Sequence, residues 1–222
     1  MFSILKPFIF KIDPETAHDL AIKSLKYNFL PEDLFEVKNE EILETEIFNT
    51  KIKNPIGLAA GFDKSAEVYN SLFKFGFGFI EVGTVTPKKQ YGNPKPRVFR
   101  LEQDRALINR LGFNNDGLEK VSERIHKNSP KGFLGVNIGP NKDSKNRVDD
   151  YLKCLKEIYI SANYITINIS SPNTPGLRDF HDEKTLQDLL KNITEFTKKK
   201  KINKPLVLKI SPDTADKEMI SL

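Results

Sequence analysis

A short polar loop follows a buried strand in the second half of the chain. Its sequence over 168–174 is Asn-Ile-Ser-Ser-Pro-Asn-Thr, and it comes directly after the β-branched and aromatic run 164–167. The loop therefore presents two amides and three hydroxyls where a strand opens, which is where α/β barrels place catalytic groups. The same residue types satisfy backbone groups in ordinary polar turns, so the loop taken alone fits both interpretations.

Other predicted strands also end in polar side chains. Taken singly, such a lysine is most often a surface residue and such an asparagine a turn residue. One functional group at each of several successive strand ends is instead typical of a barrel's active face. These strand-end groups are Asp63 and Lys64, Thr84, Asn137, Asn168 and Lys209.

Hydrophobic periodicity predicts the elements that must hold these groups. Strands alternate with helices, which implies parallel pairing through right-handed crossovers. A doubly wound sheet would need a glycine-rich or Walker-type phosphate loop after a strand, and the sequence contains neither. The predicted strands are 55–61, 77–83, 133–138, 164–169 and 206–210, and the helices are 65–75, 115–127, 148–159 and 183–201, with a hairpin over 46–53 and a long loop over 84–105.

The chain has 222 residues, whereas a complete barrel takes about 250. We therefore predict an α/β fold, a (β/α)8 TIM barrel with about its first five strands, in residues 39–222. Residues 1–38 are predicted to form a small helical element, with a helix start at Asp13-Pro14. Its apolar faces and nearby lysines are typical of an interfacial membrane helix, and equally of a face packed on the main domain.

Composition excludes several classes of function. The net charge is +5, but the run 198–201 of four lysines closes a helix and lacks interleaved aromatics, so we predict no nucleic-acid binding. The single cysteine, Cys154, excludes an internal disulfide. The three histidines lack metal-ligand spacing, so no metal site is predicted. No apolar run reaches the roughly 20 residues that span a bilayer, and no signal-peptide cleavage site follows the N-terminus.

Seven ordered segments together resemble one family, the quinone-linked (class 2) dihydroorotate dehydrogenases. The resemblance covers the whole chain in one register. Its segments are Asn-Pro-Ile-Gly-Leu-Ala-Ala-Gly-Phe-Asp-Lys at 54–64, Gly-Phe-Gly-Phe-Ile-Glu-Val-Gly-Thr-Val-Thr-Pro at 76–87, Asn-Pro-Lys-Pro-Arg-Val-Phe-Arg at 93–100, Ile-Asn-Arg-Leu-Gly-Phe-Asn-Asn at 108–115, Gly-Val-Asn-Ile-Gly at 135–139, the loop 168–177, and Leu-Lys-Ile-Ser-Pro-Asp at 208–213.

The resemblance implies an FMN-containing barrel that oxidises (S)-dihydroorotate to orotate in de novo pyrimidine (UMP) biosynthesis. A proton would leave C5 of the substrate, and a hydride would pass from C6 to flavin N5. Ser171 is implied as the general base, with Thr174 as its relay partner. The related soluble class has a cysteine at this position, so Ser171 favours the quinone-using class.

The resemblance also assigns the remaining site residues. Lys64 would neutralise the orotate carboxylate or the reduced flavin, and Lys209 would lie at the flavin N1/C2 carbonyl edge. The expected substrate-binding residues are Lys64, Asn109, Arg110, Leu111, Gly112, Phe113, Asn168 and Asn173. The expected FMN-binding residues are Ala60, Gly61, Phe62, Asp63, Lys64, Thr84, Asn137, Asn168 and Lys209.

The helical element 1–38 matches the family's membrane-associated domain at the quinone entrance. This implies ubiquinone or menaquinone as final electron acceptor, and peripheral attachment to the cytoplasmic face of the cell membrane. The family's remaining strands, including the loops for the FMN phosphate, lie beyond Leu222. We therefore expect the 222-residue chain alone to retain FMN poorly.

Two alternatives remain at this point. One is a truncated remnant that binds no FMN, which flavin absorbance of the purified chain would detect. The other is a different FMN barrel such as a tRNA dihydrouridine synthase, which the basic charge suggests. Against the second alternative stands Ser171, where those enzymes are expected to use a cysteine.

Overall fold

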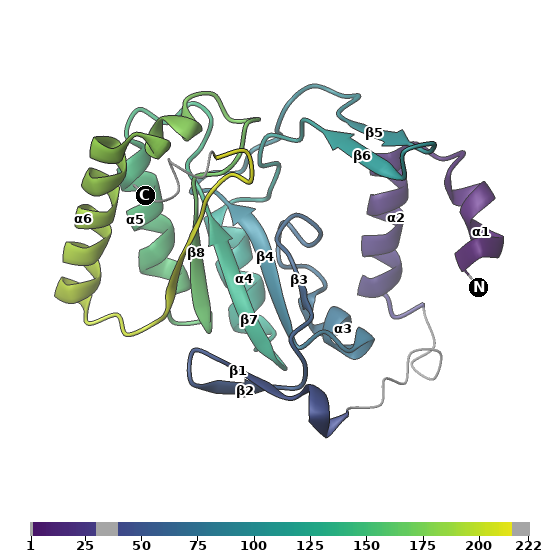
Figure 1. The fold of residues 1–222 in the computed structure, drawn as a ribbon, viewed down its shortest axis with the longest axis horizontal. Coiled ribbons are helices and arrows are strands. Elements are labelled where there is room, and N and C mark those ends of the chain that lie inside the picture. Colours follow the sequence, from purple (N-terminus) through teal and green to yellow (C-terminus); the bar gives the residue numbers. More distant parts are fainter. Residues whose placement is uncertain (1, 30–39, 215–222) are drawn as a thin grey trace.

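A five-stranded parallel sheet forms the centre of the molecule (Figure 1). The computed structural model describes residues 2–29 and 40–214. The strands follow the order β3-β4-β7-β8-β9, so each new strand is added beside the previous one, as in a barrel. The predicted alternation and parallel pairing are confirmed. The strands are β3 (Gly57–Leu58), β4 (Phe79–Val85), β7 (Phe133–Ile138), β8 (Tyr164–Asn168) and β9 (Leu206–Lys209).

Helices α4, α5 and α6 pack along one side of this sheet (Figure 1). Their apolar stripes and the strand residues that face them form the main core, which excludes water from both layers. Two of the helices start at side-chain caps: Asn146 accepts from the backbone N–H of Asp149, and Asp182 accepts from that of Thr185. The bounds are α4 (Leu118–Lys127), α5 (Arg147–Ile158) and α6 (Glu183–Lys200).

A small antiparallel hairpin covers the amino-terminal ends of the strands. It consists of β1 (Thr45–Ile47) and β2 (Thr50–Ile52). Ile52 forms a separate apolar cluster with Phe133 and Tyr164, which are the first residues of β7 and β8. Because this end of the sheet is filled with apolar side chains, the opposite, carboxyl-terminal end is left for polar groups.

The N-terminal element contains the two predicted helices, α1 (Phe2–Ile9) and α2 (Pro14–Lys26). The predicted cap is confirmed, since Asp13 accepts a hydrogen bond from the Thr16 N–H at 2.9 Å. Residues 30–38 of the predicted helical element, and the helix start predicted after the fifth strand, lie outside the described residues. Within the described ranges, no helix combines the length and apolar character needed to cross a membrane.

Three local predictions were wrong. The strand predicted over 55–61 is reduced to the two residues of β3, Gly57 and Leu58. The region 84–105 was predicted as one loop, but its end forms a hairpin of β5 (Val98–Leu101) and β6 (Ala106–Asn109). Its apolar, partly β-branched residues pair across a four-residue turn, which the preceding proline- and glycine-rich stretch concealed.

The helix predicted over 65–75 is reduced to α3 (Tyr69–Leu72) and the 3-10 turn η3 (Phe73–Phe75). The Asp63 carboxylate accepts from the backbone N–H groups of Glu67 and Val68, which holds that segment in a turn. A further 3-10 helix that was not predicted, η4 (Leu177–His181), follows the 168–174 loop.

Two adjacent leucines on α6 test the core assignment. Leu189 is fully buried and Leu190 is 36% exposed, so Leu189→Ala creates a cavity and Leu190→Ala does not. We expect Leu189→Ala to lower the free energy of unfolding by about 2–5 kcal/mol. Leu190→Ala should cost no more than about 1 kcal/mol. Urea denaturation of both variants measures this difference, and equal losses would contradict the packing of α6 described above.

Candidate active site

A column of polar side chains rises along β4, β7 and β8 inside the apolar sheet. Its lower end is the half-buried carboxylate of Glu81. Oε2 of Glu81 accepts hydrogen bonds from the Tyr164 hydroxyl at 3.0 Å and the Thr166 hydroxyl at 2.8 Å. Oε1 accepts from Nδ2 of Asn137 at 2.8 Å. Because Glu81 binds the nitrogen of the Asn137 amide, the amide oxygen points away from Glu81, toward the carboxyl-terminal ends of the strands.

The next layer of the column consists of Thr84, Asn137 and Asn168, all buried. Oδ1 of Asn137 accepts from the Thr84 hydroxyl at 2.7 Å and from Nδ2 of Asn168 at 3.0 Å. Nδ2 of Asn168 also donates to the Thr84 hydroxyl at 3.0 Å. The sequence predicted these three as cofactor ligands on separate strands, and the structure brings them into direct contact.

The 168–174 loop continues directly from this cluster. Oδ1 of Asn168 accepts from both the backbone N–H and the hydroxyl of Ser170, and the buried Tyr151 hydroxyl donates to the Asn168 carbonyl at 2.6 Å. The half-buried Ser171 accepts at Oγ from the Asn173 N–H at 3.2 Å. The Thr174 hydroxyl is buried and finds no hydrogen-bond partner within the described residues. It is therefore available to a group outside the described chain.

Asn173 and the predicted substrate segment 109–113 lie against each other. Nδ2 of Asn173 donates to the Asn109 carbonyl at 3.4 Å. Asn109 ends β6 and is exposed, so it belongs to the hairpin and not to a barrel strand end. The Arg110 guanidinium donates to the Pro96 carbonyl, which gives it a role in holding the segment. Gly112 has φ +72°, and a Cβ there would lie 2.9 Å from the Asn93 side chain.

The loop after β3 carries the remaining predicted cofactor residues. Gly61 donates its N–H to the Gly83 carbonyl at 3.0 Å, which ties this loop to the end of β4. Asp63 is buried, and both of its carboxylate oxygens are used on backbone N–H groups of the following turn. Burial raises the pKa of Asp63 even though these hydrogen bonds act in the opposite direction. Its side chain holds the loop that presents Phe62 and Lys64.

Lys64 is half-buried and makes no hydrogen bond or ion pair with any described residue. Burial lowers the pKa of its ammonium from the ordinary 10.5, and the nearby Glu15 carboxylate opposes that shift. The same surroundings lower the pKa of His18, first through burial and then through the charge of Lys64. A partly desolvated lysine without a bonded carboxylate is suited to an anionic ligand.

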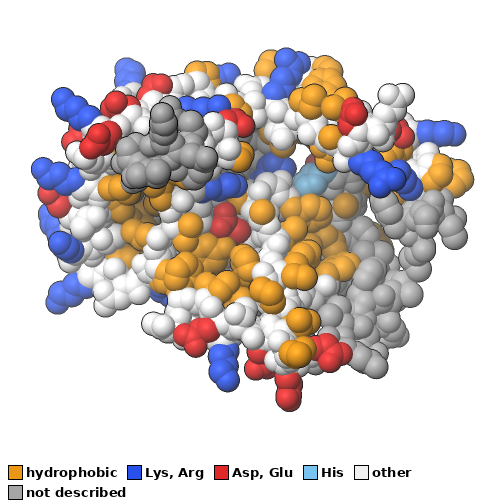
Figure 2. Space-filling view, viewed as in Figure 1, with side chains coloured by type: hydrophobic (Ala, Val, Ile, Leu, Met, Phe, Trp, Pro, Cys, Tyr) orange, Lys and Arg blue, Asp and Glu red, His pale blue; other side chains and the backbone are white. Residues whose placement is uncertain are grey.

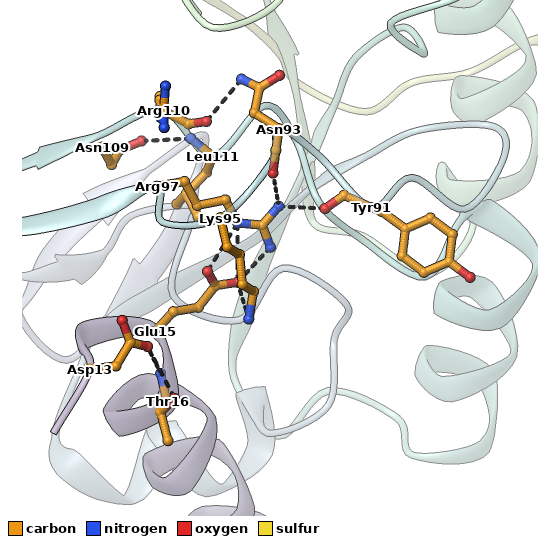
Figure 3. Close-up of polar contacts among 10 residues, drawn as sticks. All are labelled: Asp13, Glu15, Thr16, Tyr91, Asn93, Lys95, Arg97, Asn109, Arg110 and Leu111. Carbon is orange, nitrogen blue, oxygen red and sulfur yellow. Dashed lines mark hydrogen bonds and ion pairs between the residues drawn. The ribbon is translucent and has the colours of Figure 1, made fainter.

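A cleft of about 1010 Å³ opens beside Lys64. It lies between α2, the 61–67 loop and the β5–β6 hairpin, and Figure 2 shows the hollow beneath that hairpin. Of the predicted site residues, the cleft is lined by Gly61, Phe62, Asp63, Lys64, Asn109 and Leu111. The His18 ring packs edge-on against Phe62, with centroids 5.1 Å apart. Arg97 and Glu15 form part of the same wall, where they make the ion pair drawn in Figure 3.

The predicted residues therefore fall into two groups. Thr84, Asn137 and Asn168 form the buried cluster, with Lys209 paired to Asn168 in the strand register. The cleft group lies at the hairpin and the 61–67 loop, and the Ser171 loop reaches it through Asn173. Sequence reasoning missed Glu81, although a carboxylate inside the apolar run 79–85 signals a buried partner.

The residues present fit a flavin ring. Donors and acceptors of the buried cluster lie at strand ends, and Thr174 keeps an unpartnered buried oxygen. Lys64 has no bonded carboxylate among the described residues. Such a set suits the amide edge of an aromatic ring that gains negative charge.

Comparison with known proteins gives concordant matches. The sequence profile of the family described as "Dihydroorotate dehydrogenase" matches residues 42–222. "Dihydroorotate dehydrogenase (quinone)" of Idiomarina loihiensis is 46% identical over 99% of the chain and 68% of its own length. That of Bartonella tribocorum is 49% identical over 95% of the chain and 59% of its own length.

The structural match agrees with these sequences. A crystal structure of DHODH from Eimeria tenella in complex with ferulenol superposes with a TM-score of 0.86 at 40% identity. The match covers 94% of the chain and 62% of that structure. The present chain thus spans about three fifths to two thirds of the length of these relatives, and its five strands are a part of an α/β barrel.

The lowered pKa of Lys64 predicts a pH-dependent stability effect. Burial in the folded protein disfavours the charged form of Lys64. The resulting loss of stability is complete at pH values below the pKa of Lys64 in the folded protein, and it disappears as pH rises to 10.5. Lys64→Met should therefore raise the thermal midpoint of the flavin-free protein at pH 7, by an amount that shrinks towards pH 10.5. The matched change at the exposed Lys88 should leave the midpoint unaltered at both pH values. A gain that is independent of pH would show that the charge of Lys64 is not the cause.

Proposed function

The chain belongs to the dihydroorotate dehydrogenase family, and on this premise we propose that the protein oxidises (S)-dihydroorotate to orotate in UMP biosynthesis. Family membership implies a flavin, and we propose that it is FMN. A membrane quinone, ubiquinone or menaquinone, is the proposed final electron acceptor. The observation that carries the proposal is the contact of the Asn168–Thr174 loop with both the buried amide cluster and Asn109.

Ser171 is the proposed general base for the substrate proton. Its Oγ accepts the Asn173 N–H, which leaves the hydroxyl hydrogen free to point elsewhere. A serine hydroxyl is a weak base at neutral pH, so it needs a site shielded from water and a proton relay. The buried Thr174 hydroxyl, which has no partner among the described residues, is the proposed relay.

Amides of the site bind and orient the substrate ring in this proposal. Asn109 and Asn173 lie against each other, and carboxamides can both donate to and accept from the ring's amide edges. Lys64 supplies positive charge for the substrate carboxylate or the flavin, and the lack of a carboxylate bonded to it within the described residues supports this role. Arg110 and Gly112 shape the segment, since one binds Pro96 and the other makes room for Asn93.

Bound FMN would supply a hydride acceptor for C6 of the substrate. Thr84, Asn137 and Asn168 would hold its amide edge, and Lys209 would lie beside the edge where negative charge develops. Gly61 and Ala60 would border the ring, because small residues permit close backbone approach.

The cleft beside α2 is the proposed route of the quinone. It is open between the N-terminal element and the sheet, and its lining includes Phe62 and Ile22 as well as His18. We further propose that residues 1–38 attach the protein peripherally to the cytoplasmic face of the membrane. Phe8 is exposed on α1, which suits insertion at an interface. The match to the dihydroorotate dehydrogenase profile favours this flavin barrel over a tRNA dihydrouridine synthase.

Removal of the Ser171 hydroxyl tests the proposed chemistry. In the flavin-loaded protein, Ser171→Ala should lower the rate of flavin reduction by dihydroorotate on the order of 10²- to 10⁴-fold while FMN content stays normal. Ser171→Cys should shift the pH optimum downward, because a free thiol titrates near about 8.5 and an alcohol far higher. Near-normal turnover of the alanine variant would reassign the base.

A bulky side chain in the cleft tests the proposed quinone route. Ala17 of α2 lines the cleft, so Ala17→Phe should slow oxidation of the reduced protein by quinone and leave its reduction by dihydroorotate unchanged. Ala21 of the same helix is exposed and lies outside the lining, which makes Ala21→Phe the matched control. Stopped-flow measurement of each half-reaction separates the two effects. Equal slowing by both variants would place the quinone elsewhere.

A further inference from the structure

A buried ion pair joins helix α2 to the turn that leads into β5. We propose that Glu15 and Arg97 are a positioning pair that couples the placement of α2 to the placement of Asn109 and Asn173. The inference rests on the proposed function, because it takes those two asparagines as ligands of the dihydroorotate ring.

The pair has the geometry of a rigid fork (Figure 3). Nε of Arg97 donates to the two carboxylate oxygens of Glu15 at 3.2 and 3.0 Å, and Nη2 donates to Oε1 at 2.5 Å. The side chains are 6% and 11% exposed, so water hardly screens the interaction. The hydrogen bond from Arg97 lowers the pKa of Glu15, which keeps the carboxylate ionised.

The other side of the Arg97 guanidinium donates hydrogen bonds to the tight turn at residues 91–93. Nη1 of Arg97 donates to the carbonyls of Tyr91 at 2.5 Å and Asn93 at 2.9 Å. Gly92 between them has φ +78°, and a Cβ there would lie 2.7 Å from Nη1 and 2.2 Å from the Leu111 carbonyl. All three guanidinium nitrogens are therefore engaged, and the turn 91–93 is packed closely between Arg97 and the 109–112 segment.

Asn93 of this turn also contacts the two segments that carry the proposed substrate ligands. Nδ2 of Asn93 donates to the Arg110 carbonyl at 2.9 Å and to the Asn173 carbonyl at 3.4 Å. The backbone N–H of Asn93 donates to the Leu111 carbonyl at 3.0 Å. Asn173 in turn donates to the Asn109 carbonyl. A continuous set of contacts thus runs from Glu15 on α2 through Arg97 and Asn93 to both asparagines.

Loss of the Glu15 charge would disturb the positions of Asn109 and Asn173. A buried guanidinium without its carboxylate must seek other acceptors, and the carbonyls of the turn are the ones it already contacts. Displacement of that turn shifts the segments that carry Asn109 and Asn173. Small misplacements of groups that bind a substrate are costly, so affinity for the ring should fall.

Lys95 provides a matched control for the charge of Glu15. Its ammonium lies 3.5 Å from the same Glu15 oxygen, but its side chain is 61% exposed. Within the described residues it makes no hydrogen bond to the turn 91–93. If the effect on orotate binding is transmitted through the turn, it depends on Arg97 and not on Lys95. If it arises only from a change of charge near Glu15, removal of the Lys95 charge should also alter orotate binding.

Orotate binding by the flavin-loaded protein tests the coupling. Isothermal titration calorimetry should show that Glu15→Gln weakens orotate binding by about tenfold. Glu15→Asp should restore part of the affinity, and Lys95→Gln should bind like the parent protein. Rapid-reaction kinetics should show a higher dihydroorotate concentration for half-maximal flavin reduction. The limiting rate should change less, because the contacts from Glu15 act on the ring ligands Asn109 and Asn173 and reach Ser171 only through the Asn173 N–H.

A double-mutant cycle tests the route through the turn. Asn93→Ala removes the contacts to Arg110 and Asn173, so Glu15→Gln added to it should weaken orotate binding no further. Additive losses would overturn the route. Parent-like orotate affinity of Glu15→Gln, with only the quinone half-reaction slowed, would overturn the inference and leave the proposed function intact. A parent protein that binds no orotate would overturn both.

Discussion

The hydrogen bonds accepted by the Glu81 carboxylate organise the interior on which the candidate site stands. A carboxylate in an otherwise apolar sheet is costly unless donors replace its water, and Tyr164, Thr166 and Asn137 do so at 2.8–3.0 Å. The Tyr164 ring occupies the space that a Cβ at Gly135 would fill. Because the side-chain amide nitrogen of Asn137 donates to Glu81, its amide oxygen faces the site. The Thr84 hydroxyl and the Asn168 amide donate to that oxygen, so their positions follow from its orientation.

Two parts of the site are held in different ways. The buried amide cluster stands on parallel strands whose ladder fixes the backbone, so its geometry is set by the sheet. The residues around Asn109 stand on a two-stranded hairpin and depend on side chains such as Asn93 and Arg97 for their position. In the proposed function, the flavin ring would thus be held by strand residues, while the asparagine proposed to bind the substrate at position 109 lies on a hairpin that depends on its neighbours.

The positive charge of Lys64 beside the cleft opposes folding. Lys64 is partly desolvated with no carboxylate bonded to it in the described residues, and His18 beside it has a lowered pKa. Folding is opposed by such an arrangement, whereas an anionic ligand is favoured by it. The Glu15 carboxylate interacts electrostatically with Lys64 but accepts its hydrogen bonds from Arg97. The Lys64 ammonium therefore remains available to a ligand in the cleft.

The sequence alone determined the parallel fold, the strand ends that carry polar groups and the family, because alternating periodicity and ordered motifs are local signals. It did not reveal the hairpin β5–β6, since proline and glycine hid a short β-branched run. The partners of Glu81 and the pair of Glu15 with Arg97, 82 positions apart, were decided only by the tertiary structure. The physical reason is that a buried charge must find its partner in space, and separation along the chain carries no information about which one it finds.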